Sequence, residues 1–311
     1  MRQAGRWDPE FRRVRANLSF YEFSADVERS LEASLCPRRF GVDAVILFYD
    51  ITTLPLAMGL PFELKKDIGP QPDRPIHSLT DLERLNPEPN PASYGHIREL
   101  LQRAKQRLAG DLPVIVFAGS PFTVATYCIG TGKDMAGTRR FAAENPQVWH
   151  GLLERLQRAT VGFLNTLIDD GADVYQLFDS WAGMLTPSEY DDWAQAPHTE
   201  ILAAATGVPR ILFVKECPYL ERMATTGAEV ISLGNRHDLA AAQVQFPQLV
   251  FQGNVDEAIL RTGTPETVTA TTNAVLAAGG GRRHVLNLNH GVGKETPPAN
   301  FEAYVRAARG E

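Results

Sequence analysis

The sequence predicts a (β/α)8 barrel that forms a single domain over residues 1–311, with the first strand missing from this chain. Short apolar runs alternate with longer helical patterns along nearly the whole length, as in a parallel sheet covered by helices. We count seven such runs, whereas a closed barrel has eight strands. No Gly-x-Gly-x-x-Gly turn follows the first run, and a nucleotide-binding doubly wound sheet would carry one there.

The seven predicted strands are almost continuously hydrophobic, which is typical of strands buried on both faces. They are Asp43–Phe48, Pro113–Ala118, Asp173–Phe178, Arg210–Lys215, Glu229–Leu233, Leu249–Gly253 and His284–Leu288.

Helical patterns fill the segments between these strands. The clearest is Asn145–Gly171, whose apolar residues recur with a period of 3.6 and which ends at a glycine. The others often begin with proline near the first turn. They are Ser93–Ala109, Pro187–Ala205, Pro265–Ala278 and Pro298–Ala308. The proline-rich stretch Asp67–Pro91 predicts a long surface excursion.

The missing first strand would precede Arg2. We expect the true start of the protein to lie upstream of this chain. The alternative is an incomplete barrel with an exposed strand edge, which we expect to be less stable and less active.

Composition excludes several classes of protein. A formal net charge of −6 gives no support to binding of nucleic acid or of an anionic membrane. The three cysteines, Cys36, Cys128 and Cys217, are too few and too widely spaced for a disulfide framework, which favours a reducing compartment. No apolar stretch approaches the roughly 20 residues of a membrane span. The chain opens without an apolar signal region, so we expect a cytoplasmic protein.

Polar residues follow the predicted strands, where barrel enzymes build their active sites. They are Asp50, Ser120, Asp179 with Ser180, Lys215 with Glu216, Asn254, and Asn289 with His290. Asp179 is equally compatible with capping the next helix, and we interpret Asn254 as such a cap. Asp50 is a weaker cap candidate because no clean helix start follows it. The glycines near His290 indicate backbone that comes close to a ligand.

Arg2 and Arg6 form a second candidate site. Two guanidinium groups four residues apart around small residues would repel each other unless an anion lay between them. Together with backbone N–H groups they could bind a carboxylate or a phosphate. The alternative is a flexible, solvated basic terminus.

Six blocks of sequence, in order along the entire chain, resemble a known family. They are Met-Arg-Gln-Ala-Gly-Arg-Trp-x-Pro-Glu-Phe-Arg at 1–12, Arg38–Ile51, Phe117–Tyr127, Gln176–Gly183, Gln252–Asp256, and Asn287–Gly291 followed by Thr-Pro-Pro at 296–298. Their order and content are similar to those of the uroporphyrinogen decarboxylases.

The resemblance implies a homodimeric (β/α)8 barrel that converts uroporphyrinogen III to coproporphyrinogen III, without metal or organic cofactor, on the route to haem. It implies Asp50 and Arg2 as catalytic residues, with Asp50 contacting the pyrrole N–H groups. The substrate-binding residues that it implies are Arg2, Gln3, Ala4, Gly5, Arg6, Asp50, Tyr127, Ser180 and His290.

The implied chemistry agrees with these residue types. Protonation of the pyrrole carbon beside an acetate arm creates a cationic ring, which can accept the two electrons left by CO2. A carboxylate at Asp50 would stabilise that charge, and one such group is typically worth about 3–4 kcal/mol. Our hypothesis is that Arg2 supplies or relays the proton; because guanidinium is a poor acid, a bound water is the alternative.

Besides the missing first strand, the sequence departs from the family pattern at Tyr49 and in two later segments. Tyr49 stands where the family usually has Ser. The segments Lys215–Pro218 and Ser232–Asn235 replace the usual Lys-Gly and Gly-Leu-Asp-Trp blocks. We favour a variant of the same enzyme over a changed substrate.

Two rival functions remain open. One is a zinc-dependent corrinoid or coenzyme methyltransferase of the same superfamily, although Cys217 has no His or second Cys close to it in sequence. The other is a barrel that binds a tetrapyrrole without turnover.

Overall fold

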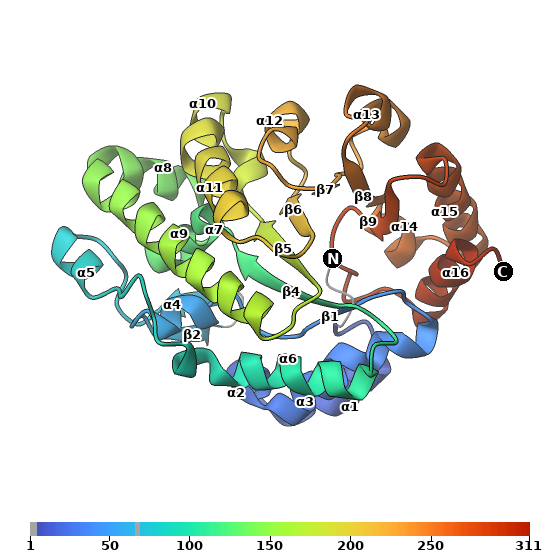
Figure 1. Cartoon of the computed structure of the whole chain (residues 1–311), viewed down its shortest axis with the longest axis horizontal. Helices are drawn as coiled ribbons and strands as arrows, with labels where there is room; N and C mark the ends of the chain where they lie inside the picture. The colour runs from blue at the N-terminus through green and yellow to red at the C-terminus, as the bar shows by residue number, and fades with distance from the viewer. Residues whose placement is uncertain (1–4, 66–68) are drawn as a thin grey trace.

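A computed structural model describes residues 5–65 and 69–311 of the chain. Its main sheet has seven strands, all parallel to their neighbours, in the order β1-β4-β5-β6-β7-β8-β9. The sheet curls inside a layer of helices (Figure 1). The strands are β1 Val45–Ile46, β4 Val114–Gly119, β5 Val174–Asp179, β6 Arg210–Val214, β7 Val230–Ser232, β8 Val250–Val255 and β9 His284–Leu288.

The helices cover the outer face of the sheet. They are α1 Pro9–Arg15, α2 Phe20–Ala25, α3 Val27–Leu35, α4 Thr53–Ala57, α5 Leu79–Glu83, α6 Gly95–Leu108, α7 Pro121–Cys128, α8 Met135–Glu144, α9 Pro146–Asp169, α10 Pro187–Tyr190, α11 Ala196–Ala204, α12 Leu220–Ala224, α13 Leu239–Gln245, α14 Glu257–Thr262, α15 Pro265–Gly279 and α16 Pro298–Ala308. None of the described helices is long and apolar enough to cross a bilayer.

The prediction of a barrel with one strand missing is confirmed. Each of the seven predicted strands overlaps an observed one, because long apolar runs buried on both faces leave little room for another structure. Among the described residues, β1 and β9 each pair with a single neighbour, so the sheet remains open between them. The segment Gly5–Trp7 lies near this opening, where the Trp7 ring packs 4.3 Å from that of Phe301 on α16.

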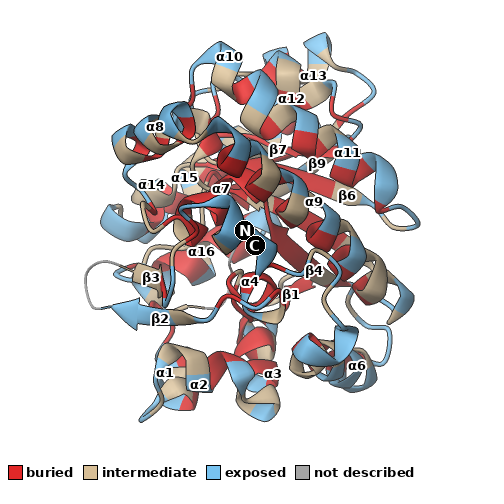
Figure 2. Cartoon of the chain, turned by 90° about the vertical axis from the view of Figure 1, so that its left-hand side faces the viewer, coloured by how far each residue is buried: buried red, intermediate tan, exposed pale blue. Residues whose placement is uncertain are grey.

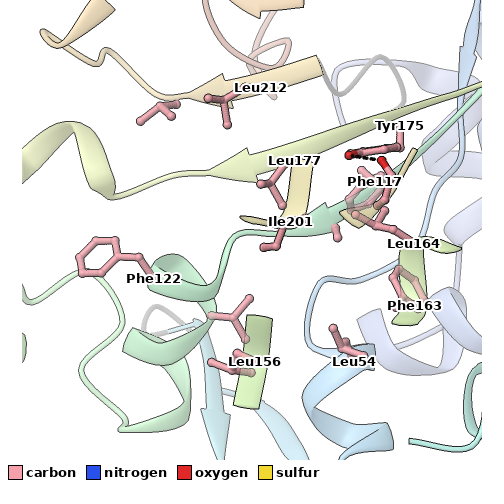
Figure 3. Close-up of a cluster of buried hydrophobic side chains, with 14 of the residues drawn as sticks. Leu54, Phe117, Phe122, Leu156, Phe163, Leu164, Tyr175, Leu177, Ile201 and Leu212 are labelled. Carbon is pink, nitrogen blue, oxygen red and sulfur yellow. Dashed lines mark hydrogen bonds between the residues drawn. The ribbon is translucent and has the colours of Figure 1, made fainter. Parts of the chain in front are cut away.

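The main core lies between the strands and α9. This helix begins with Pro146 at its first turn, and Gly171, at a φ of +100°, follows its end. Figure 3 shows Leu156, Phe163 and Leu164 from this helix in a buried cluster that also contains Leu177 of β5. Each such side chain contributes about 2 kcal/mol when fully buried. In Figure 2 the strands of the main sheet are mostly buried, β2 (Phe62–Lys65) is exposed, and the helices turn exposed faces outward.

Two stretches differ from their predictions. The proline-rich stretch Asp67–Pro91 contains β3 (Gly69–Pro72), which pairs antiparallel with β2 (Phe62–Lys65), and the short helix α5. The predicted helix Pro187–Ala205 is divided, because a π-helical turn at Asp191–Gln195 separates α10 from α11. A π turn adds a residue to the helical repeat, which the apolar pattern of one sequence does not reveal.

Tyr49 lies three residues beyond β1, ends the pairing of this segment with β4 and thereby places Asp50. The N–H groups of Val45 and Leu47 donate to the carbonyls of Pro113 and Ile115. Two residues further, the N–H of Phe117 donates to the Tyr49 hydroxyl at 2.5 Å, and this hydroxyl donates to the Phe117 carbonyl. The two rings stack with their centroids 4.1 Å apart. The Tyr49 side chain therefore takes the place of the next backbone pair, and the chain turns at Asp50.

Candidate active site

A cavity of about 330 Å³ opens at the carboxyl edge of the parallel strands. Its wall is mainly aromatic, with Phe20, Phe48, Phe117, Phe178 and Phe213. Four polar side chains reach it from the segments after four different strands: Asp50 after β1, Tyr127 after β4, Ser180 after β5 and His290 after β9. The parallel sheet therefore brings together residues that lie up to 240 positions apart in the sequence.

Asp50 is the buried acid of this cavity, with a relative exposure of 8%. Burial raises the pKa of Asp50 to about 6, although hydrogen bonds from the Thr52 hydroxyl and the N–H groups of Thr52 and Ile51 act in the opposite direction. Helix α4 has no side-chain cap, so Asp50 is not used as one. At neutral pH the carboxylate is therefore ionised but poorly solvated, and it would bind a positive charge strongly.

Tyr21 is a site residue that the sequence did not indicate. Its hydroxyl lies buried close to Thr52 and Asp50. Burial, together with the negative charge of Asp50, raises the pKa of Tyr21 to about 12. Tyr21 therefore keeps its proton and adds a neutral polar group behind the acid.

A second cavity of about 420 Å³ adjoins the first and shares Phe20, Phe48, Leu64, His290 and Gly291 with it. We call it the mouth. Its lining also includes the backbone of Gly5 and Gly293 and the cationic side chains of Arg6, Arg15 and Lys294.

Positive charge in the mouth is largely uncompensated. Burial, and then the charge of Arg6, lower the pKa of Arg15. In the part of the chain that the structure describes, neither arginine lies in an ion pair. The acidic side chain in the lining is Glu257, which lies 3.7 Å from Arg261. Guanidinium groups without a carboxylate partner in the protein form a binding site for the carboxylates of a ligand.

The described members of the predicted site thus lie in two adjoining cavities. Gly5 and Arg6 line the mouth, whereas Asp50, Tyr127 and Ser180 line the aromatic cavity and His290 lines both. The predicted residues Arg2, Gln3 and Ala4 lie outside the described residues. Arg15 and Lys294 were not predicted as site residues. The sequence signal for them was that each is a basic residue close to a block that resembles the family.

Ser180 is held by a network in which Asp179 plays the central part. The Asp179 carboxylate accepts from Ala182 N at 2.9 Å and from the Thr123 hydroxyl at 2.8 Å, and Thr123 accepts from Ser180 N at 2.8 Å. Asp179 therefore holds the turn after β5, although it is not the helix cap that the sequence allowed, because Trp181 occupies the N-cap position of the following 3₁₀ helix. Asp179 does not line either cavity.

The Asp179 carboxylate is balanced by a buried histidine. His198 Nε2 lies 3.1 Å from Asp179 Oδ2 and 2.9 Å from the Ser120 hydroxyl. Burial alone would raise the pKa of Asp179, but the hydrogen bond and charge of His198 outweigh it and lower that pKa. Ser120 is thus a buried structural residue. Although serine, histidine and aspartate meet here, serine and aspartate share one ring nitrogen, so the group is not a nucleophilic triad.

Asn254 does not cap a helix, contrary to the prediction. Its amide donates to the carbonyls of Gly234 at 3.0 Å and His237 at 2.8 Å, whereas Asp256 caps α14. Asn254 instead stabilises the loop after β7, which comes close to Asn254 only when the sheet has formed.

The described residues do not supply the ligands of a zinc methyltransferase. In residues 5–65 and 69–311, no three His, Cys, Asp or Glu side chains are arranged to hold a metal ion.

The family model of uroporphyrinogen decarboxylase (URO-D) matches residues 1–310. The chain belongs to this family. Curated relatives named uroporphyrinogen decarboxylase include those of Psychromonas ingrahamii (36% identity, 99% of this chain and 90% of the relative), Synechococcus sp. strain CC9605 (36%, 99% and 90%) and Nitrosococcus oceani (37%, 99% and 89%).

Solved structures match this URO-D family member over nearly its whole length. A methyltransferase from Methanosarcina mazei has a TM-score of 0.78 at 18% identity, covering 99% of this chain and 93% of that one. A hyperthermophilic β-glucosidase from Pyrococcus furiosus has a TM-score of 0.55 at 11% identity, covering 100% and 91%. At these identities the likeness shows the barrel fold alone.

Proposed function

We propose that this URO-D family member decarboxylates the four acetate side chains of uroporphyrinogen III and releases coproporphyrinogen III. The observation that carries the proposal is the buried carboxyl group of Asp50 in an aromatic cavity that adjoins a cationic mouth. The tetrapyrrole ring is apolar on its faces and carries carboxylates at its edge, and the two cavities are complementary to these two parts.

In the proposed reaction the apolar wall holds a pyrrole ring with its N–H directed at Asp50. A proton adds to the ring carbon that bears the acetate arm, and the ring becomes a cation next to the carboxylate of Asp50. The bond between the arm's CH2 and its carboxylate then breaks, CO2 leaves, and the electron pair neutralises the ring. A second proton converts the exocyclic CH2 to a methyl group, and loss of the first proton restores the pyrrole. The net change is one proton consumed and one CO2 released.

Asp50 lowers the barrier because its charge is fixed before the cation forms. A carboxylate in water would be surrounded by solvent that must reorganise, whereas Asp50 is already oriented by Thr52 and the backbone of Ile51. Aromatic side chains exclude water around it. Arg6, Arg15 and Lys294 are proposed to bind the arms that are not reacting. The residues named above do not include the proton donor. The hypothesis that Arg2 supplies or relays the proton stays a prediction.

A homodimeric state, a cytoplasmic location and activity without a cofactor complete the proposal. They rest on the family and on the sequence.

Anaerobic incubation with uroporphyrinogen III tests the proposal. The products are oxidised and separated by their number of carboxyl groups. We expect porphyrins with four carboxyl groups, as the end of a series that starts from eight. Recovery of eight-carboxyl porphyrin alone would contradict the proposed function. Porphyrin binding without products would then support a non-catalytic barrel, and zinc-dependent methyl transfer would support the methyltransferase.

A further inference from the structure

Glu216 has a backbone conformation that is unfavourable for its residue type. It follows β6 with a φ of +46°, in the left-handed region that glycine tolerates. Such a conformation persists only where the surrounding contacts fix it, and it is often found beside functional sites. Glu216 belongs to Lys215–Pro218, one of the two segments that depart from the family pattern.

The Glu216 side chain joins the segments that follow three strands. Its Oε1 accepts a hydrogen bond from Asn289 Nδ2 at 2.9 Å, in the segment after β9. Its Oε2 lies so close to Gly234, after β7, that a Cβ at that position would come within 2.8 Å. Arg236 Nε lies 3.9 Å from the same carboxylate. The second departing segment, Ser232–Asn235, therefore packs on the first, and the two departures form a single structural feature.

Asn289 is the residue through which this feature reaches the candidate site. It is 7% exposed, its N–H donates to the Val255 carbonyl at 2.9 Å, and its Oδ1 accepts from Glu257 N at 2.9 Å. The next residue is His290, which lines both cavities. Glu216 supplies the acceptor for the Asn289 amide group and so completes its bonding.

We infer that Glu216 is a positioning residue that fixes His290 through Asn289. Glu216 does not line either cavity, so its effect on substrate must be indirect, and the contact with Asn289 leads to His290. The inference rests on the proposed function for its effect on turnover. Its structural part, the coupling of Glu216 to His290, can be tested without turnover.

The test compares two substitutions of Glu216. Glu216→Gly removes the carboxylate and also relieves the left-handed strain, so the fold is preserved. We expect it to lower kcat/KM for uroporphyrinogen III by about 10-fold, as is usual for supporting hydrogen bonds around a site. Glu216→Gln keeps an oxygen that accepts from Asn289 and should retain activity within about threefold. Ala109→Gly is the matched control, because it relieves the same strain (φ of +48°) at the end of α6.

A double-mutant cycle identifies the route. If Glu216 acts through Asn289, Glu216→Gly should have little further effect in an Asn289→Ala background. Wild-type kcat/KM in Glu216→Gly, or effects that add in the double variant, would overturn the inference.

A second readout separates this inference from the proposed function. The chain has seven histidines, and the ring resonances of His290 can be assigned by their loss in His290→Gln. Glu216→Gly should shift them, whereas Glu216→Gln and Ala109→Gly should not. If the wild type lacks decarboxylase activity but this pattern appears, the proposed function fails and the positioning role stands. Unchanged His290 resonances in Glu216→Gly would refute the positioning role.

Discussion

Replacing Asp50 by asparagine is expected to lower decarboxylation by about 10²–10³-fold and at the same time to stabilise the fold at neutral pH. The loss of activity follows because an amide carries no charge to balance the cationic pyrrole. The gain in stability follows because the buried carboxylate is poorly solvated in the folded protein. A residue that supports only folding would not show these opposite effects.

The stability effect has a defined pH dependence. Burial raises the pKa of Asp50 from 3.8 to about 6, so the folded state binds the proton more tightly than the unfolded chain does. The stability that this group contributes is therefore present below about pH 4 and is lost as the pH rises through 6, by about 3 kcal/mol in total. Asparagine does not titrate. Urea unfolding should therefore show Asp50→Asn gaining about 2.4 kcal/mol relative to wild type between pH 4 and pH 7.5.

Asp43→Asn is the matched control for this experiment. It makes the same change in charge just before β1, where the side chain is 99% exposed, and it should alter neither activity nor the pH dependence of stability. A difference between Asp50→Asn and wild type that is the same at both pH values would contradict the burial of an ionised Asp50.

The second large effect is expected at His198. His198→Leu leaves the Asp179 carboxylate buried without its histidine partner, since both side chains have a relative exposure of 0%. Breaking such a pair by removing one partner typically costs about 3–5 kcal/mol in the free energy of unfolding. Asp179 also holds the turn that contains Ser180 and Ala182. We therefore expect His198→Leu to lose activity in parallel with the loss of folded protein.

Equilibrium unfolding in urea measures this cost, and the chain supplies its own control. His150 and Asp192 form a surface pair with a distance of 3.9 Å, in which both side chains are more than half exposed. His150→Leu should change stability by less than about 1 kcal/mol. The double variant Asp179→Asn with His198→Leu should recover part of the loss. A cost below about 1 kcal/mol for His198→Leu alone would show that the buried pair does not support the fold.

The seven strands and the main helices could be predicted because their signals are local. A continuous apolar run predicts a buried strand, and a 3.6-residue period predicts a helix, each from residues that are close together in the sequence. The β2–β3 pairing was missed because Pro70 and Pro72 favour a loop and because only one residue of the two strands, Pro72, is buried. The π turn at Asp191–Gln195 leaves no such signal.

The polar side chains of the candidate site were predicted in part for the same reason. Asp50, Ser180 and His290 follow strands directly, and the carboxyl edge of a parallel sheet brings such residues together. Arg15 could not be placed, because only the packing of α1 decides that its last turn faces the mouth. The misassignment of Asn254 has a similar cause, since its partners lie in a loop 17 to 20 residues away.

The central claim is that an ionised Asp50 in an apolar cavity drives decarboxylation, and the pH dependence of kcat/KM tests it most directly. With uroporphyrinogen III under anaerobic conditions between about pH 5.5 and 8.5, the free enzyme should lose activity as the pH falls through the pKa of Asp50, about 6. The decrease in kcat/KM on the acid side should fit the binding of one proton, and the Asp43→Asn variant should show the same decrease. A kcat/KM that rises as the pH falls below 6 would mean that the protonated acid is the active form, and it would contradict the account.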